Sequence, residues 1–287
     1  MPHIMEILGK TKVVVKDGKV VEVGEPQITW CPLWNKVSGV EDITNDMARQ
    51  NMEQRIKEFG MFTPQRRFDL GVFASFGISE ILMSALRRGL IDSTVTVCDG
   101  AGTVITSNPD LVQGMSAQIS GLVETEPIPE VIDAIHDMGG SILDTGTAAI
   151  DQAAGFTMAV EQGHRRIAVS VVDVASALRV RAIEAGEGAR AGTEAILMAA
   201  HLTGIDPEDT QKLLKLVDVV TGCASGNIRK LVKPLIQVGT AIPLFGLTDQ
   251  GKALLIERAK EIESPLLVHT MDLPVLPEDK QPKPLKD

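Results

Sequence analysis

The chain has 287 residues, 44% of them apolar, and a net charge of −10. This length suffices for one large α/β domain or two small ones. It contains no tyrosine, two tryptophans and seven phenylalanines. A mechanism that needs a phenolic acid or base is therefore excluded. Acidic charge and few stacking rings also argue against nucleic-acid binding.

The first residues do not resemble a signal peptide, because Glu6 and Lys10 interrupt what would be its apolar core. No later run approaches the length of about 18 apolar residues that a membrane span needs. We therefore expect a soluble, cytoplasmic protein that does not bind membranes. The three cysteines are an odd number without an export signal, so we expect thiols or ligands rather than disulfides.

The N-terminal quarter predicts a hairpin followed by one helix. Two β-branched runs, 12–15 and 19–23, flank Asp17-Gly18, a favoured type I′ turn pair. Thr44 can cap a polar helix that runs to Phe59 and ends at Gly60. Both tryptophans also lie in this quarter, around Cys31.

From residue 78 onward, helical periodicity alternates with short apolar runs. The predicted helices are 78–90, 109–121, 129–138, 147–162, 174–184, 193–202, 207–216, 225–235 and 249–261. The predicted strands are 94–97, 142–143, 167–172, 217–220, 241–245 and 266–268. This alternation predicts an α/β fold of three layers, with a mainly parallel sheet flanked by helices and a small N-terminal β-hairpin subdomain.

The same pattern divides the chain into three parts. Residues 1–76 form the hairpin and aromatic-rich segment, and residues 77–276 form the α/β domain. Residues 277–287 are rich in proline, lysine and aspartate, so we expect this tail to be disordered.

Ligands of open α/β sheets bind beyond the carboxyl ends of the strands. Polar residues expected there include all three cysteines, Cys31, Cys98 and Cys223, together with His269. These four could hold an iron–sulfur cluster or zinc. Their wide spacing lacks a CxxC pair, however, and free cysteines also occur as small buried apolar residues or as reactive thiols.

Two aspartates at predicted strand ends are candidate general bases. Asp99 lies beside Cys98 and has no evident capping role, whereas Asp173 could simply cap the next helix. The 99–103 turn contains Gly100 and Gly102 but lacks the third glycine of a dinucleotide fingerprint.

A second set of residues could bind an anion. Thr145, Gly146 and Thr147 follow Asp144 where a strand is predicted to end and a helix to begin, which would leave free N–H groups. A tight turn with an N-cap is the alternative. Arg66 could grip a carboxylate or phosphate, or could be a solvated surface residue. His201 is predicted near a helix C-terminus, where an imidazole is favourable without any chemistry.

Several stretches of the chain resemble the methanogenesis marker protein 8 family. They are His3-Ile4-Met5-Glu6, the hairpin at 12–23, Trp30-Cys31-Pro32-Leu33, Val97-Cys98-Asp99-Gly100-Ala101-Gly102-Thr103-Val104, Ile119-Ser120-Gly121-Leu122 and Gly239-Thr240-Ala241-Ile242-Pro243. The resemblance runs from residue 3 to about residue 275. It implies a cytoplasmic protein of an archaeal methanogen that acts as an accessory factor, for example in cofactor assembly or in maturation of methyl-coenzyme M reductase. It carries over no catalytic residues.

Three functions are compatible with these observations. The first is a methanogenesis accessory protein that binds an iron–sulfur or related metallocofactor, or a small anionic ligand, in the strand-end crevice. The second is an enzyme that acts on a small phosphorylated or carboxylated substrate with an aspartate base. The third is a non-catalytic subunit that docks onto a protein partner through the aromatic segment, with Trp34 and Phe62 exposed. The sequence does not set the oligomeric state, and a homo-oligomer is compatible with it.

Overall fold

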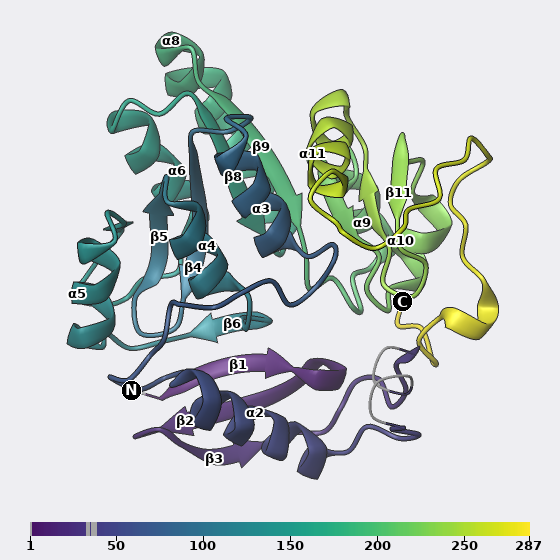
Figure 1. Ribbon diagram of the computed structural model, residues 1–287, viewed down its shortest axis with the longest axis horizontal. Helices are drawn as coiled ribbons and strands as arrows, with labels where there is room; N and C mark the ends of the chain where they lie inside the picture. Colours follow the sequence, from purple (N-terminus) through teal and green to yellow (C-terminus); the bar gives the residue numbers. More distant parts are fainter. Residues whose placement is uncertain (1, 33–34, 36–38) are drawn as a thin grey trace.

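The computed structural model describes residues 2–32, 35 and 39–287, which form two β-sheets and their covering helices. The smaller sheet lies below the larger one in Figure 1, and the helix after the hairpin packs against it. The larger sheet forms the centre of a layered α/β unit.

The small sheet is antiparallel throughout and has the strand order β3-β2-β1-β6. Its members are β1 (His3–Ile7), β2 (Thr11–Lys16), β3 (Lys19–Val23) and β6 (Gly121–Glu124). The predicted hairpin is confirmed as β2 and β3, with φ of +50° at Asp17 and +67° at Gly18, as a type I′ turn requires. The edge strand β6 comes from much later in the chain, so the small sheet is not built from the N-terminal quarter alone.

The helix α2 (Asn45–Phe59) covers the small sheet. Thr44 accepts a hydrogen bond from the amide of Met47 at 3.3 Å, and Gly60 ends the helix in the left-handed conformation, as predicted. Met52 and Ala48 share an apolar core with Met5 and Val13 of the sheet.

The large sheet has eight strands in the order β11-β12-β10-β9-β8-β4-β5-β7. Their bounds are β4 (Ser93–Cys98), β5 (Gly102–Thr106), β7 (Ser141–Ile142), β8 (Arg166–Val171), β9 (Glu194–Ala199), β10 (Val219–Thr221), β11 (Ile236–Val238) and β12 (Leu244–Gly246). The central strands β4, β8, β9 and β10 are parallel, and the flanking strands β5 and β12 pair antiparallel to them.

Helices cover both faces of this sheet, which confirms the three-layer α/β fold. One face packs against α6 (Gln152–Glu161), α7 (Val174–Ile183), α9 (Pro207–Leu213) and α10 (Gly226–Leu231). The other packs against α3 (Ile78–Arg87), α4 (Pro109–Ser116) and α11 (Asp249–Ala259). The helix α5 (Pro129–Asp137) packs beside β5 and β7. Short helical turns complete the chain: η1 (Leu8–Lys10), η2 (Glu184–Gly188), α8 (Ala189–Ala191) and η3 (Glu278–Lys280).

The predicted helix 193–202 is wrong, because this segment forms the central strand β9. Its alanine, leucine and methionine residues favour a helix when considered alone. In the fold, β9 pairs in parallel with β8 and β10, and Ala195 to Ala199 are buried. Burial on both sheet faces therefore outweighs helix propensity here. The residues that follow, including His201, thus lie beyond the carboxyl end of a central strand.

Other segments also differ from the predictions. The helix expected from residue 147 begins instead at Gln152, with Asp151 capping the amide of Ala154 at 3.0 Å. Residues 266–268 form no strand, and Leu267 and Val268 are exposed. The C-terminal tail contacts the turn after β10, where the amide of Lys286 donates to the carbonyl of Ala224 at 2.7 Å.

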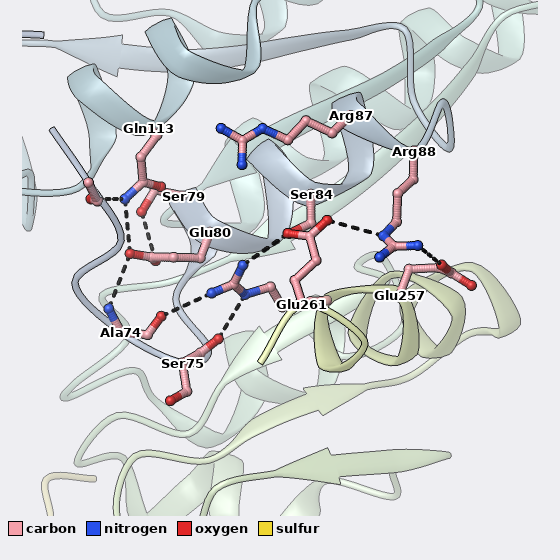
Figure 2. Close-up of polar contacts among 12 residues, drawn as sticks. Ala74, Ser75, Ser79, Glu80, Ser84, Arg87, Arg88, Gln113, Glu257 and Glu261 are labelled. Atoms are coloured by element: carbon pink, nitrogen blue, oxygen red, sulfur yellow. Dashed lines mark hydrogen bonds and ion pairs between the residues drawn. The ribbon is translucent and has the colours of Figure 1, made fainter. Parts of the chain in front are cut away.

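Two buried charged side chains attach the loop that precedes α3, as Figure 2 shows. Glu80 accepts hydrogen bonds from the amides of Phe73 and Ala74 and from the side chain of Gln113. Arg258 of α11 donates to the carbonyls of Ala74 and Ser75 and also bonds Ser84 and Glu261. These contacts hold the loop across the ends of α3 and α11.

Among the described helices, none combines the length and the apolar character that crossing a bilayer would require.

Candidate functional site

The Cys98-Asp99-Gly100 turn lies where the two sheets meet, and it is completely buried. Asp99 accepts from the amide of Phe62 at 2.7 Å and from Nε of Arg66 at 2.9 Å. Arg66 also donates to the carbonyls of Arg67, Gly114 and Met115. Burial opposes the charge of Arg66, but the Asp99 carboxylate outweighs it and raises the pKa of the guanidinium.

His3 completes this buried group, which we name the joint cluster: His3, Arg66, Cys98, Asp99 and Thr125. Nδ1 of His3 lies 2.8 Å from the hydroxyl of Thr125. The same hydroxyl accepts a hydrogen bond from the amide of Gly100 at 2.8 Å. Burial lowers the pKa of His3, although Glu126 and Asp99 oppose the shift. The joint cluster therefore ties β1 and β6 of the small sheet to β4 of the large one.

The joint cluster leaves little scope for the predicted chemistry of its members. Asp99 is 0% exposed and forms an ion pair with Arg66, so in this structure a substrate cannot reach the carboxylate to use it as a base. The sulfur of Cys98 lies 3.3 Å from the carbonyl of Asp99, and burial raises the pKa of this thiol well above its usual value. Without a metal ion, the buried Cys98 therefore carries its proton at neutral pH. Arg66 is neither solvated nor free for an anion.

Asp173, the turn at 144–147 and His269 lie outside the joint cluster, in exposed positions. Asp173 caps α7 through the amide of Ser176 at 2.7 Å, which was the alternative weighed for it. Asp144 accepts from the amides of Gly146 and Thr147 and from the Thr147 hydroxyl, so its own carboxylate occupies the proposed anion turn. Thr145 is exposed in the same turn, and His269 is exposed in the segment after α11.

A cavity of about 210 Å³ lies between the small sheet and the carboxyl ends of β9 and β10. It contains two of the predicted cysteines, Cys31 and Cys223, and we name it the inter-sheet cavity. Its lining comprises Ile7, Leu8, Gly9, Lys10, Ile28, Cys31, Arg55, Ser120, His201, Thr203, Cys223, Ala224, Ile242 and Pro282. Residues from both sheets and from the C-terminal tail thus enclose it.

Two cationic side chains line the inter-sheet cavity from the small-sheet side. Lys10 donates to the carbonyl of Thr203 at 2.6 Å, and Arg55 of α2 donates to the carbonyl of Gln118 at 2.6 Å and the Ser120 hydroxyl at 3.3 Å. Burial lowers the pKa of Arg55 to about 10. Within the described residues, neither Lys10 nor Arg55 forms an ion pair with a carboxylate.

A third cation, Arg229 of α10, lies behind the turn that carries Cys223. It is 5% exposed and donates to the carbonyls of Cys223 and Ala241. Its Nη1 is buried and has no hydrogen-bond partner among the described residues. Burial lowers the pKa of Arg229 to about 10, against the opposing influence of the Cys223 and Cys31 sulfurs. A buried guanidinium N–H without a hydrogen-bond partner lowers the stability of the fold, and an anion that accepted a hydrogen bond from it would remove this penalty.

Cys223 occupies a sharp turn between β10 and α10. Its φ is +41°, an uncommon conformation for a residue other than glycine. Its sulfur accepts the amide of Leu202 at 3.4 Å and lies 3.0 Å from the hydroxyl of Thr221. Cys31 is 8% exposed and belongs to the small-sheet core, so its sulfur reaches the cavity from the opposite side.

His201 also lines the cavity, in the left-handed conformation with φ of +62°. Its Nε2 lies 2.5 Å from Oε2 of Glu6, and this hydrogen bond lowers the pKa of Glu6. The absence of a side chain at Gly121 makes room for the imidazole, because a Cβ there would collide with it. Glu6 therefore fixes one ring nitrogen and leaves Nδ1 for another contact.

The geometry favours an anion site over a metal centre. Two thiols line the cavity, while Cys98 belongs to the joint cluster. Residues 2–32, 35 and 39–287 contain no group of three or more His, Cys, Asp or Glu side chains placed to hold a metal ion. Two cations that form no ion pair in these same ranges, Lys10 and Arg55, instead line the cavity, and Arg229 lies behind the Cys223 turn.

Comparison with known proteins agrees with an archaeal origin. Residues 3–260 match the family described as "uncharacterized protein conserved in archaea (DUF2099)". The chain belongs to this family. It is also 46% identical over 286 residues to "uncharacterized protein MJ0054" of Methanocaldococcus jannaschii, with 99% of each chain covered. No solved structure matches the chain.

Sequence reasoning for this family member missed Lys10, Arg55, His201 and Arg229. The sequence did contain a signal for His201. It follows the apolar run 194–199, and identifying that run as a strand would have placed His201 among the polar residues at strand ends. Arg55 lies on a polar helix with several other charged residues, and nothing local distinguishes it. Lys10 and Arg229 become notable only when tertiary contacts place them beside the cavity.

Proposed function

We propose that this protein is an accessory protein of methanogenesis that binds a small anionic ligand, a carboxylate or a phosphate, in the inter-sheet cavity. The observation that carries the binding proposal is that Lys10 and Arg55 both line one cavity and neither forms an ion pair within the described chain. Arg229 adds a third positive charge behind the turn that carries Cys223. The net charge of −10 makes such a local excess of positive charge more significant.

The size of the cavity limits the ligand. At about 210 Å³ it lies below the usual range of roughly 300–1,000 Å³ for drug-sized ligands, so a molecule of few heavy atoms fits best. Anion binding there would offset the burial of Arg55, which lines the cavity. The resemblance to the methanogenesis marker protein 8 family and the relative from a methanogen support the cellular setting.

The metallocofactor and docking hypotheses have weaker support. A cluster bound here would have two cysteine ligands, Cys31 and Cys223, from this part of the chain. Docking through the aromatic segment needed Phe62 to be exposed, but Phe62 is 3% exposed and contacts the ring of His3. Trp34 lies outside the described residues.

Thermal unfolding with inorganic phosphate as the probe tests the binding proposal. At constant ionic strength, phosphate should raise the Tm of the native protein, because a ligand at ten times its Kd stabilises the folded state by about 1.4 kcal/mol. Arg55→Gln should abolish this rise. The matched control is Arg49→Gln on the same helix, since Arg49 donates to the carbonyl of Val20 and does not line the cavity.

An equal phosphate response in Arg55→Gln and Arg49→Gln would overturn the assignment of the site. Acetate in place of phosphate then distinguishes the two ligand classes: a larger shift with acetate favours a carboxylate, and a larger shift with phosphate favours a phosphoryl group.

A further inference from the structure

A thiol and an imidazole line the inter-sheet cavity, and a carboxylate that is not itself in the lining holds the imidazole, an arrangement that binding alone does not require. Cys223 and His201 both line the cavity, and Glu6 holds the far nitrogen of the imidazole at 2.5 Å. A nucleophile, a base and a group that orients the base form the usual set for nucleophilic catalysis. The residues come from β1, from the end of β9 and from the turn after β10.

We propose that Cys223 is a catalytic nucleophile that adds to the carbonyl carbon of a small carboxylate bearing an aldehyde or ketone, with His201 as its base. This inference rests on the proposed function, because the cations of the cavity would hold the carboxylate of the substrate. It goes beyond binding by assigning a reaction and the residues that perform it.

The turn around Cys223 presents its sulfur to the cavity. The residue follows a strand directly, precedes a helix and has φ of +41°, as nucleophiles at sharp strand-to-helix turns do. Arg229 donates to the carbonyl of Cys223, and the amide of Gly222 donates to the carbonyl of Pro243 at 2.6 Å. These bonds hold the backbone on both sides of the sulfur, so the geometry is maintained without substrate.

Two hydrogen-bonding groups and one cation lie beside the sulfur of Cys223. The amide of Leu202 and the hydroxyl of Thr221 lie 3.4 Å and 3.0 Å from Sγ, where each can donate a hydrogen bond to a thiolate. The positive charge of Arg229 acts on the same atom. These groups could stabilise the thiolate that forms when a base removes the proton, and the thiolate is the attacking species.

The reaction balances without any additional reagent. The proton of the Cys223 thiol passes to His201 as the sulfur forms a bond to the carbonyl carbon. The π electrons of the C=O bond move to the oxygen, which then takes the proton back from His201. The product is a hemithioacetal or hemithioketal, and no bond to a leaving group breaks.

Alkylation kinetics on the intact protein test the reactivity of Cys223. Iodoacetate carries a carboxylate and iodoacetamide does not, so peptide mass spectrometry of both reactions reports charge recognition at each cysteine. Relative to N-acetylcysteine, Cys223 should prefer iodoacetate by about tenfold because the cavity attracts anions. Arg55→Gln should remove this preference for iodoacetate, whereas Arg49→Gln should keep it. His201→Asn should slow the reaction of Cys223 with both reagents. Asparagine is chosen at this position because it tolerates the left-handed backbone.

Glyoxylate labelled with ¹³C at its aldehyde carbon tests the addition itself. The native protein should give a carbon resonance of the sulfur adduct, distinct from that of the hydrate, and Cys223→Ser should not. Glyoxylate should also slow alkylation of Cys223 more than acetate does, since acetate fills the site without forming a bond. Loss of folding in Cys223→Ser would not affect the alkylation result, which uses the native cysteine.

Two outcomes separate this inference from the proposed function. If phosphate raises the Tm but glyoxylate gives no adduct and Cys223 reacts no faster than Cys31, the nucleophile assignment is wrong and anion binding stands. If phosphate gives no shift and Cys223 shows no preference for iodoacetate, both are wrong.

Discussion

The joint cluster and the inter-sheet cavity both connect the small sheet to the large one, yet their charges are arranged in opposite ways. In the joint cluster, Arg66 has Asp99 and three carbonyls as partners, and Asp99 is fully enclosed. Arg55, in the cavity lining, and Arg229, behind the Cys223 turn, have carbonyl partners and form no ion pair among the described residues, where Nη1 of Arg229 has no partner either. The first region is complete by itself, and on our proposal an anion completes the second.

This contrast teaches that the most distinctive sequence string need not mark the functional site. Cys98-Asp99-Gly100-Ala101-Gly102-Thr103 owes its composition to packing, because Gly102 has φ of +72° and a Cβ there would collide with the carbonyl of Ala148. The hydroxyl of Thr103 accepts the amide of Asp151 at 2.8 Å. On our proposal, cations without an ion-pair partner, such as Arg55, are the better indicator of a ligand site in the described part of this molecule.

The largest expected effect is in the joint cluster. Asp99→Asn should lower the free energy of unfolding by roughly 3–5 kcal/mol, because it leaves the charge of Arg66 buried without a counter-charge. Urea denaturation measures the change. Asp110→Asn, which breaks the exposed ion pair with Arg87 at 2.7 Å, should cost less than about 1 kcal/mol. Equal costs for the two variants would remove the distinction between the joint cluster and an ordinary surface pair.

Gly102→Ala should have the next largest effect. Both the left-handed backbone and the carbonyl of Ala148 oppose a side chain at this position. Gly89→Ala is the matched control, since Gly89 has φ of +65° and, in the described chain, a Cβ at this position would have no atom within 4 Å. We expect about 1 kcal/mol of destabilisation for Gly89→Ala and at least about 2 kcal/mol more for Gly102→Ala. A similar Tm for both variants would show that the turn at residue 102 can adjust to accommodate a side chain.

A smaller effect is expected from the pH dependence of His3. Burial lowers its pKa below the usual 6.5, so the unfolded chain takes up a proton first as the pH falls. Stability should therefore be full above about pH 6.5 and decrease as the pH falls from there toward the folded pKa. In His3→Asn this decrease should be weaker, whereas His136→Asn, at an exposed position, should retain it. Urea denaturation between about pH 5 and pH 8 measures both.

The smallest expected change in stability is at the cavity. Arg55→Met removes a desolvated cation that has no carboxylate partner in the described chain, so it should alter the free energy of unfolding by less than about 1 kcal/mol without phosphate. The same variant should show no phosphate-dependent rise in Tm. Arg66→Met provides the comparison and should cost several times more, since it leaves Asp99 buried alone. A large loss in Arg55→Met would mean that Arg55 serves the fold.

Much of the fold could be predicted from the sequence, because local signals agree with the final structure. Asp17-Gly18 sets the hairpin turn, and Thr44 and Gly60 set the ends of α2. The strand β9 could not be predicted in this way, since its helix-forming residues become a strand only when β8 and β10 lie on either side. Non-local pairing decides such a segment.

The candidate site was predicted less completely, for a related reason. Cys31 and Cys223 were identified from their positions after apolar runs, and both line the cavity. The error at β9 placed His201 on a helix and removed it from the strand-end set. Asp99 and Arg66 were each identified, but the sequence did not show that they satisfy each other across 33 positions of the chain.

The lining of the inter-sheet cavity has a consequence for motion. Arg55 and Lys10 belong to the small-sheet side, while His201 and Cys223 follow strands of the large sheet. A ligand that contacts both sides would bind the state in which the two sheets are closed against each other, and not states in which they separate. Local opening at this boundary would become rarer on binding, and amide hydrogen exchange would slow in β1 and in the turns after β9 and β10 together. Occupancy of the inter-sheet cavity would thus reduce the mobility of the whole boundary between the two sheets.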